Sequence, residues 1–163
     1  MKKPPPMVIT HPTASHLPAL EFAAREAGDG LVIEHGAGLY STPLFARLGC
    51  RVVCVETHPG WAEWASWVYQ GKSAVVAALD VRQLADAALV FIDGPADERG
   101  PLLSACIEYG VPTIIAHDTG PKTRDYYGYK PHHFMVTRYE VSHPVDRTTV
   151  WKLKPPMGVP FDV

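Results

Sequence analysis

Five short apolar segments alternate with helix-like ones between residues 31 and 116, and this alternation limits the folds open to the chain more than any other feature. The apolar segments are residues 31–33, 51–55, 74–78, 88–92 and 112–116. An alternation of strand and helix predicts a parallel sheet with helices on both faces. Continuous apolar runs are typical of strands buried on both faces.

Two later segments, 134–141 and 148–153, have the apolar or alternating pattern of strands, with a proline-containing turn between them. We expect them to form an antiparallel pair at one edge of the sheet. The predicted fold class is therefore α/β: a Rossmann-like, doubly wound, mostly parallel sheet with an antiparallel edge pair. At 163 residues, the chain is expected to form a single domain over 1–163, with irregular ends at 1–12 and 155–163.

The 16 prolines are predicted to mark the boundaries of these elements. Proline fits the first turn of a helix, where its missing N–H costs nothing. We therefore expect Pro43, Pro59 and Pro101 to begin helices, with the hydroxyls of Ser41 and Thr42 capping the helix at Pro43.

Composition excludes some classes of function. The net charge of −2 provides no general basic field for nucleic acid, and no apolar segment is long enough to span a membrane. Three prolines after Met1-Lys2-Lys3 interrupt what would be the core of a signal peptide. Cys50, Cys54 and Cys106 lack metal-like spacing and are expected to be buried, reduced thiols. We expect a cytoplasmic protein.

Acidic side chains follow each of the five predicted parallel strands. They are Glu34, Glu56, Asp80, Asp93 and Asp118. The carboxyl ends of parallel strands meet at one edge of a sheet, where ligands of such folds bind. The pattern therefore predicts a ligand site lined by acidic side chains at this edge. Asp80 has a second interpretation, because it is also placed to cap a short helix that begins at Val81.

The first turn, Gly36-Ala37-Gly38, resembles a dinucleotide-binding turn but has Ser41 where that fingerprint requires its third glycine. Glu34 precedes the turn and would repel a pyrophosphate, but it suits a cationic amino or sulfonium group. A carboxylate at Glu56 can accept hydrogen bonds from both hydroxyls of a ribose. A nicotinamide-dependent oxidoreductase with a degraded fingerprint remains an alternative.

Several of these segments together resemble a known family. Residues 34–38 (E-H-G-A-G), Glu56, Asp80-Val81 and Asp93-Gly94 resemble successive motifs of class I S-adenosylmethionine-dependent methyltransferases. Residues 91–94 (F-I-D-G) and 117–119 (H-D-T) resemble the small O-methyltransferase-like branch, and Thr148–Trp151 is similar to its last strand. The resemblance implies S-adenosylmethionine as cofactor.

The resemblance also implies roles for residues. Glu34 would lie near the methionine amino group of the cofactor, Glu56 would hold its ribose, Asp80 would face the adenine amino group, and Asp93 would border the methyl donor and acceptor. The full implied cofactor-binding set is Glu34, Gly36, Ala37, Gly38, Ser41, Glu56, Thr57, Asp80, Val81 and Asp93.

Asp93, His117 and Asp118 are the predicted catalytic residues. His117 is the candidate base, because imidazole titrates near neutrality, and Asp118 would orient it. Some related O-methyltransferases hold Mg²⁺ at positions matching Asp93 and Asp118, but we assign no metal ligand from the sequence.

The acceptor is less well defined than the cofactor. By analogy with the branch, we expect an oxygen of a small molecule, and nucleic acid or protein acceptors remain open, as does a homodimer. Tyr126, Tyr127 and Tyr129 either line an acceptor pocket or pack a long loop. A non-catalytic cofactor-binding module of the same fold is the remaining alternative.

Overall fold

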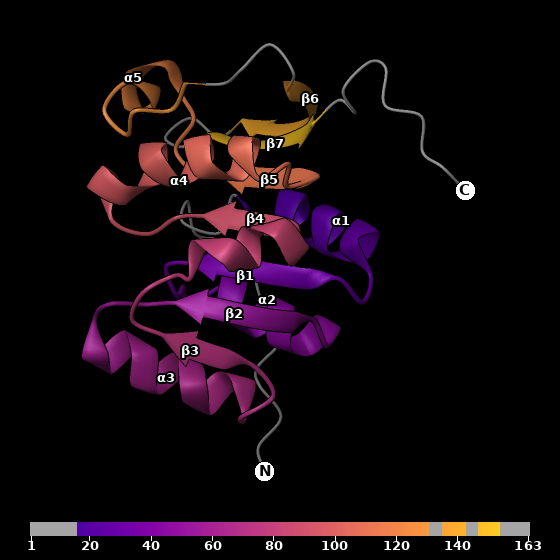
Figure 1. Ribbon diagram of the computed structural model, residues 1–163, viewed down its shortest axis with the longest axis vertical. Helices are drawn as coiled ribbons and strands as arrows, with labels where there is room; N and C mark the ends of the chain where they lie inside the picture. The colour runs from indigo at the N-terminus through magenta and orange to yellow at the C-terminus, as the bar shows by residue number, and fades with distance from the viewer. Residues whose placement is uncertain (1–15, 131–134, 143–146, 154–163) are drawn as a thin grey trace.

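The computed structural model describes residues 16–130, 135–142 and 147–153. Its centre is a seven-stranded sheet with the strand order β3-β2-β1-β4-β5-β7-β6 (Figure 1). Strands β1 to β5 pair in parallel, and β7 runs antiparallel to both β5 and β6. The strands are β1 Leu31–His35, β2 Arg51–Val55, β3 Ala74–Val76, β4 Ala87–Ile92, β5 Thr113–Ala116, β6 Met135–Ser142 and β7 Arg147–Leu153. The predicted fold class is confirmed.

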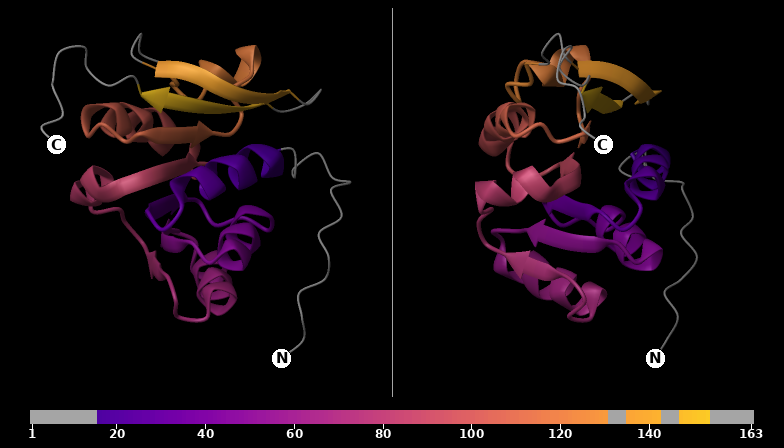
Figure 2. Two further views of the ribbon diagram at one scale, coloured as in Figure 1. Left: turned by 90° about the vertical axis from the view of Figure 1, so that its right-hand side faces the viewer. Right: turned by 45° about the vertical axis from the view of Figure 1, so that its right-hand side comes forward.

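Helices cover both faces of the sheet (Figure 2). The helices are α1 Leu17–Ala27, α2 Ser41–Leu48, α3 Pro59–Tyr69, the 3₁₀ helix η2 Val81–Asp86, α4 Ala96–Glu108 and α5 Pro121–Arg124. Helices α1, α2 and α3 pack on one face, and η2 and α4 pack on the other. Each crossover between parallel strands therefore contributes to one of two layers.

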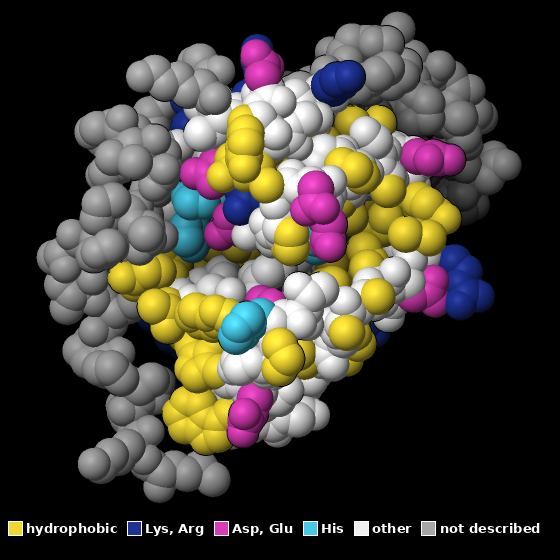
Figure 3. Space-filling model, turned by 90° about the vertical axis from the view of Figure 1, so that its left-hand side faces the viewer, with side chains coloured by type: hydrophobic (Ala, Val, Ile, Leu, Met, Phe, Trp, Pro, Cys, Tyr) yellow, Lys and Arg dark blue, Asp and Glu magenta, His cyan; other side chains and the backbone are white. Residues whose placement is uncertain are grey.

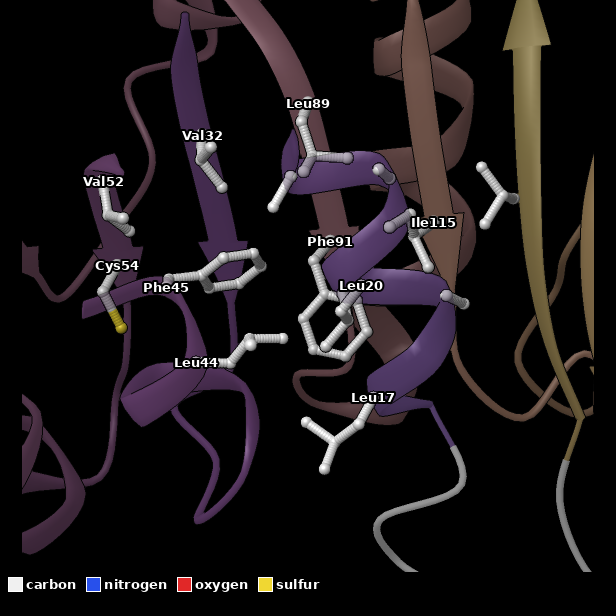
Figure 4. Packing of buried hydrophobic residues seen from close by; sticks show 14 of the residues in the cluster. Leu17, Leu20, Val32, Leu44, Phe45, Val52, Cys54, Leu89, Phe91 and Ile115 are labelled. Atoms are coloured by element: carbon white, nitrogen blue, oxygen red, sulfur yellow. The ribbon is translucent and has the colours of Figure 1, made fainter. Parts of the chain in front are cut away.

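Alternation along each strand divides the core between these layers. In β1, Val32 packs with α1 and α2, while Ile33 packs with α4 on the opposite face. Figure 4 shows the first of these clusters, in which Leu20 and Phe45 from the helices meet Phe91 from β4. Successive strand side chains point to opposite faces, so both faces of these apolar strands are buried.

Helix α4 corrects the prediction that Pro101 begins a helix. The helix starts five residues earlier at Ala96 and contains Pro101 in its interior. An interior proline costs about 3 kcal/mol, because it removes one backbone hydrogen bond and crowds the preceding turn. Two acidic residues in the first turn, Asp97 and Glu98, favour the earlier start by interacting with the helix dipole. Burial of Leu102 and its apolar neighbours in the core helps offset the cost.

Helix α2 corrects a second local prediction. Its N-cap is Tyr40, which makes no side-chain capping bond, and the hydroxyls of Ser41 and Thr42 are buried instead of capping the helix. Gly49 ends the helix in the left-handed conformation, as its position after the apolar stripe indicated.

The structure also bears on the expectations for the cysteines, for membrane-spanning segments and for the chain ends. Cys50, Cys54 and Cys106 are free thiols, and the last two are buried. Among the described residues, no helix is both long and apolar enough to cross a lipid bilayer. The predicted irregular ends, 1–12 and 155–163, and the turn at Pro144 lie outside the described residues.

Candidate functional site

The site lies where β1 and β4 are neighbours in the sheet but lead to helices on opposite faces of it, α2 and α4. At this switch point the two loops touch each other. Gly36 has φ +93°, and a Cβ atom built on it would lie 2.8 Å from Cα and N of Gly94. The amide of Asp93 donates to the carbonyl of His35 across the same junction, at 2.9 Å. Only a residue without a side chain fits at position 36.

A pocket of about 270 Å³ opens at this edge. Figure 3 looks onto this edge of the molecule, where acidic and histidine side chains gather around the centre. The lining residues come from the ends of β1, β2 and β4 and from the starts of α3 and α4. They are His35, Gly36, Ala37, Val55, Glu56, Thr57, His58, Trp61, Asp93, Gly94, Pro95 and Glu98.

Five of the predicted cofactor residues line this pocket: Gly36, Ala37, Glu56, Thr57 and Asp93. Glu56 joins the turns after β1 and β2. Its Oε2 accepts from the amide of Ala37 at 3.0 Å, and its Oε1 accepts from the amide of His58 at 2.7 Å. The carboxylate is thereby fixed beside the first turn.

Glu34 is not where the sequence placed it. Its carboxylate is fully buried and does not line the pocket. It accepts from Tyr69 Oη at 2.7 Å and from Thr42 Oγ1 at 2.9 Å, and Ser41 is a further partner. Burial raises the pKa of Glu34. This carboxylate ties β1 to α2 and α3, so its role in the structure is to join these elements rather than to line the site.

Ser41 and Gly38 share this correction. Ser41 is buried beside Glu34, and Gly38 donates its amide to Thr42 Oγ1 at 3.1 Å. Neither residue lines the pocket. The predicted contacts of Ser41 and Gly38 with a cofactor therefore have no support from the pocket lining.

His35 was missed by the sequence analysis, although it is the neighbour of Glu34. Adjacent strand residues point to opposite faces, so His35 faces the pocket and α4. Its Nδ1 accepts from the amide of Gly94 at 3.3 Å, which leaves Nε2–H to donate to Glu98 Oε2 at 2.8 Å. A Cβ atom on Gly94 would lie 2.4 Å from the imidazole, so glycine is required beneath it. The odd-and-even alternation of β1 is the signal that could have identified His35.

Asp80 and Val81 lie away from the pocket lining. Strand β3 ends at Val76 rather than at residue 78, which leaves Asp80 four positions beyond the end of the strand. Its side chain caps η2 by accepting from the amide of Arg82 at 3.1 Å, and it pairs with the Arg82 guanidinium at 2.7 Å. Val81 is 48% exposed. The capping interpretation of Asp80 is confirmed, and its predicted contact with an adenine has no support from the pocket lining.

Trp61 is a second lining residue that the sequence analysis left unassigned. It lies in the first turn of α3, lines the pocket beside His58, and packs edge-on against Trp64 with ring centroids 5.4 Å apart. Only the tertiary structure places Trp61 at the pocket.

Asp93, His117 and Asp118 come together at the ends of β4 and β5, and of the three only Asp93 lines the pocket. His117 Nδ1 lies 3.1 Å from Asp93 Oδ1 and 3.6 Å from Asp118 Oδ1. A hydrogen bond also fixes the main chain of His117, because Tyr129 Oη donates to its carbonyl at 3.1 Å. A buried imidazole hydrogen-bonded to a carboxylate is a suitable acid–base pair.

His16 adds an unexpected side chain to this cluster. It is only 4% exposed, stacks on Phe91 at 5.5 Å, and meets the His117 ring edge-on at 4.9 Å. Burial, and then the neighbouring His117, lower the pKa of His16 to about 4. Neither ring nitrogen of His16 has a hydrogen-bond partner among the described residues. His16 therefore presents a neutral polar ring to the predicted catalytic residues at neutral pH.

Arg99 is the largest omission of the sequence analysis. Its guanidinium lies 3.0 Å from Asp93 Oδ1 and 3.1 Å from Asp118 Oδ2, and its Nε donates to the carbonyl of Gly94 at 2.7 Å. Burial lowers the pKa of Arg99, but the charge of Asp93, the interactions with Tyr129 and the charge of Asp118 together outweigh that effect and raise it overall. The ring of Tyr127 lies 4.2 Å from the guanidinium carbon.

Arg99 decides whether the cluster fits a metal ion. Asp93, His117 and Asp118 each offer a ligand atom, and these atoms lie within 4.8 Å of one another. However, a permanently charged guanidinium already pairs with both carboxylates. The cluster with Arg99 in place does not fit a divalent metal.

The tyrosines of residues 126–129 mostly pack the loop that follows α5. Tyr129 is buried against Trp151 at 6.5 Å, and Tyr127 packs between Tyr129 and Arg99. Tyr126 is 74% exposed. Two of the three side chains therefore support the loop rather than line a pocket.

We compared the sequence and the structure of this chain with those of known proteins. No protein-family model and no curated protein matches the sequence. Solved structures do match. Cofactor-bound Rv0187 from MTB has 18% identity and a TM-score of 0.67, covering 91% of this chain and 83% of its own.

Two further matches carry methyltransferase descriptions. An RNA methyltransferase from Salinibacter ruber, in complex with S-adenosyl-L-homocysteine, has 14% identity and a TM-score of 0.60, covering 96% of this chain and 98% of its own. The N-methyltransferase NodS from Bradyrhizobium japonicum WM9 has 12% identity and a TM-score of 0.56, covering 85% and 94%. The chain therefore shares the fold of S-adenosylmethionine-dependent methyltransferases.

Proposed function

We propose that this chain is an S-adenosylmethionine-dependent methyltransferase that transfers the methyl group to an oxygen of a small acceptor. One observation carries the proposal. The pocket at the switch point joins the Gly36–Ala37 turn and the Glu56 carboxylate to Asp93, which in turn is hydrogen-bonded to His117. A cofactor site and an acid–base pair thus share one carboxylate.

The lining residues suit the parts of the proposed cofactor. Glu56 can exchange its backbone donors for the two ribose hydroxyls. The Trp61 ring offers an apolar surface to a nucleobase. Glu98, held by His35, and Asp93 place negative charge in the pocket, which suits an ammonium and a sulfonium group. Because Glu34 is buried, Glu98 takes over its expected role toward the methionine end.

His117 is the proposed base for the acceptor hydroxyl. When bound, S-adenosylmethionine supplies an activated methyl group on a cationic sulfonium. Asp93 fixes the His117 ring by accepting from Nδ1–H, which makes Nε2 the basic nitrogen. Asp118 lies on the same side of the ring, and the neutral His16 ring adds no competing charge. The chain aligns donor and acceptor and removes one proton.

The choice of acceptor rests on the F-I-D-G and H-D-T segments and on this base. A hydroxyl needs a base before it attacks, and His117 beside Asp93 supplies one. The RNA methyltransferase among the similar structures makes RNA the competing acceptor class. The net charge of −2 offers no general attraction for RNA, so we favour a small molecule.

Calorimetric titration with S-adenosylhomocysteine tests the cofactor. We expect saturable binding, no binding of NADH, and affinity at least about tenfold weaker in Glu56→Gln, because two hydrogen bonds from the ribose are weakened. Glu63→Gln, an exposed carboxylate on α3 outside the pocket, is the matched control and should bind like wild type. Binding of NADH in place of S-adenosylhomocysteine would identify the chain as an oxidoreductase and refute the proposal.

Transfer of radiolabelled methyl groups into separated small-molecule, RNA and protein fractions of a cell lysate tests turnover. We expect label in the small-molecule fraction, and we expect His117→Gln to lower the rate without changing affinity for S-adenosylhomocysteine. Label in RNA alone would overturn the acceptor assignment. Cofactor binding without label in any fraction would identify a non-catalytic module.

A further inference from the structure

The cluster at the ends of β4 and β5 holds its own cation. Arg99 is nearly buried, and it reaches the cluster from the first turn of α4. Its Nη1 binds Asp118, its Nη2 lies within 3.0 Å of Asp93 Oδ1, and Nη2 also donates to the main-chain carbonyl of Asp93 at 3.1 Å. One planar guanidinium therefore contacts both carboxylates and the main-chain carbonyl of Asp93.

Two neighbouring carboxylates need a positive charge close by. The side chains of Asp93 and Asp118 are largely buried, and both face the same imidazole. An oxygen of each carboxylate lies within 4.8 Å of the other. Two negative charges this close raise the free-energy cost of ionising both groups. Proteins meet that cost with a bound cation or with a basic side chain. In this chain the basic side chain is present, and it makes ion pairs with both.

The surroundings hold Arg99 in this position. The Tyr127 ring lies against the guanidinium in a cation–π contact. Helix α4 also approaches the loop closely at Gly100, where a Cβ atom would lie 2.7 Å from the carbonyl oxygen of Gly128. The Tyr127 ring thus covers one face of the guanidinium, and the packing of α4 against the loop fixes the helix that carries Arg99. The guanidinium has little freedom to leave the carboxylates.

We propose that Arg99 replaces a divalent cation in this cluster and is a positioning residue that sets the geometry of Asp93 and, through it, of His117. The inference deepens the proposed function, since it concerns the same three residues. Asp93, His117 and Asp118 form a latent divalent-cation site. Arg99 keeps that site closed, and methyl transfer needs no added metal.

Binding of Mn²⁺ to the 163-residue chain tests the proposal without any cofactor. Binding is measured as the loss of the electron paramagnetic resonance signal of free Mn²⁺. Wild type should bind no Mn²⁺ at this cluster. Arg99→Ala should gain one Mn²⁺ site, at least about tenfold tighter than any Mn²⁺ binding that wild type shows, because a unit positive charge at ion-pair distance has been removed. Arg99→Lys retains the charge and is the matched control, which should stay like wild type.

Asp118→Asn identifies the site, since it removes one ligand from the cluster. The Mn²⁺ gained in Arg99→Ala should disappear in Arg99→Ala with Asp118→Asn, whereas Mn²⁺ bound elsewhere remains in both. Arg99→Gln serves as the second neutral variant if Arg99→Ala does not fold, with circular dichroism reporting folding. Wild-type binding that Asp118→Asn abolishes overturns the proposal, as does a folded neutral variant that gains no Mn²⁺.

The readout separates this proposal from the proposed function. A chain that binds no S-adenosylhomocysteine can still gain Mn²⁺ on loss of Arg99, and a working methyltransferase can fail to do so. In an active preparation, a chelator should leave the wild-type rate unchanged. Loss of the rate on chelation, restored by Mg²⁺, would show that a metal is used and would overturn the closed-site inference.

Discussion

Substitution of Gly36 by alanine should disrupt the junction between β1 and β4 from which the pocket is built. Gly36 has φ +93°, a backbone conformation that L-residues rarely adopt. The added methyl group would lie 2.8 Å from Cα and N of Gly94 and 2.9 Å from the carbonyl carbon of Asp93. All three atoms are backbone, so no side-chain rotation can relieve the contact.

The expected cost has two parts. A left-handed conformation in a residue with a Cβ atom costs about 1–2 kcal/mol. Overpacking against the backbone adds about 1–3 kcal/mol, for a total of roughly 2–5 kcal/mol. Gly49→Ala isolates the first part, because Gly49 has φ +73° and its added methyl group meets no atom within 4 Å. We expect Gly49→Ala to cost only about 1–2 kcal/mol.

Urea denaturation of wild type, Gly36→Ala and Gly49→Ala measures these free energies of unfolding. Titration with S-adenosylhomocysteine then shows whether the pocket survives. We expect Gly36→Ala to weaken binding strongly, since Asp93 and Gly94 must move, and Gly49→Ala to bind normally. The reasoning is refuted if the two variants lose equal stability or if Gly36→Ala binds as tightly as wild type.

Three further outcomes are expected. Tyr69→Phe should lower the free energy of unfolding by about 1–3 kcal/mol in urea titrations, because the buried Glu34 carboxylate loses its 2.7 Å donor; no loss would mean that this bond is not formed. Burial lowers the pKa of His16 from 6.5 to about 4. Between pH 6.5 and pH 4, the unfolded chain therefore binds a proton at His16 that the folded chain does not bind. Stability should therefore fall by up to about 3 kcal/mol as the pH drops from 6.5 to 4, and His16→Leu should remove that part of the pH dependence. Asp80→Asn should leave the affinity for S-adenosylhomocysteine within about twofold of wild type, in contrast to Glu56→Gln; a loss as large as that of Glu56→Gln would show that Asp80 contacts the cofactor.

Much of the fold follows from local pattern. The apolar segments became the strands of one sheet, because burial on both faces selects continuous apolar runs. The strand-end carboxylates Asp93 and Asp118 also met as expected, since β4 and β5 pair in parallel and end at the same edge. Pro101 departs from local pattern, because the contacts of α4 with the core outweigh the penalty of an interior proline.

The site itself needed information that no local pattern holds. Glu34 and His35 are neighbours in the sequence, yet one is buried beneath α2 and α3 and the other lines the pocket. Which side of β1 becomes the pocket depends on which helices pack over each face. Arg99 reaches Asp118 across 19 positions of sequence, and only the packing of α4 against β4 and β5 brings them together.

The sequence by itself determined the type and order of the elements, the tight turn at Gly36 and the edge at which acidic side chains collect. These properties depend on residues within a few positions of one another and on the alternation of strand side chains. The tertiary structure alone decided which carboxylate faces the pocket, which is buried as an internal support, and which pair is bridged by Arg99. Those outcomes depend on contacts between distant segments, where charge and burial are set by whatever packs alongside.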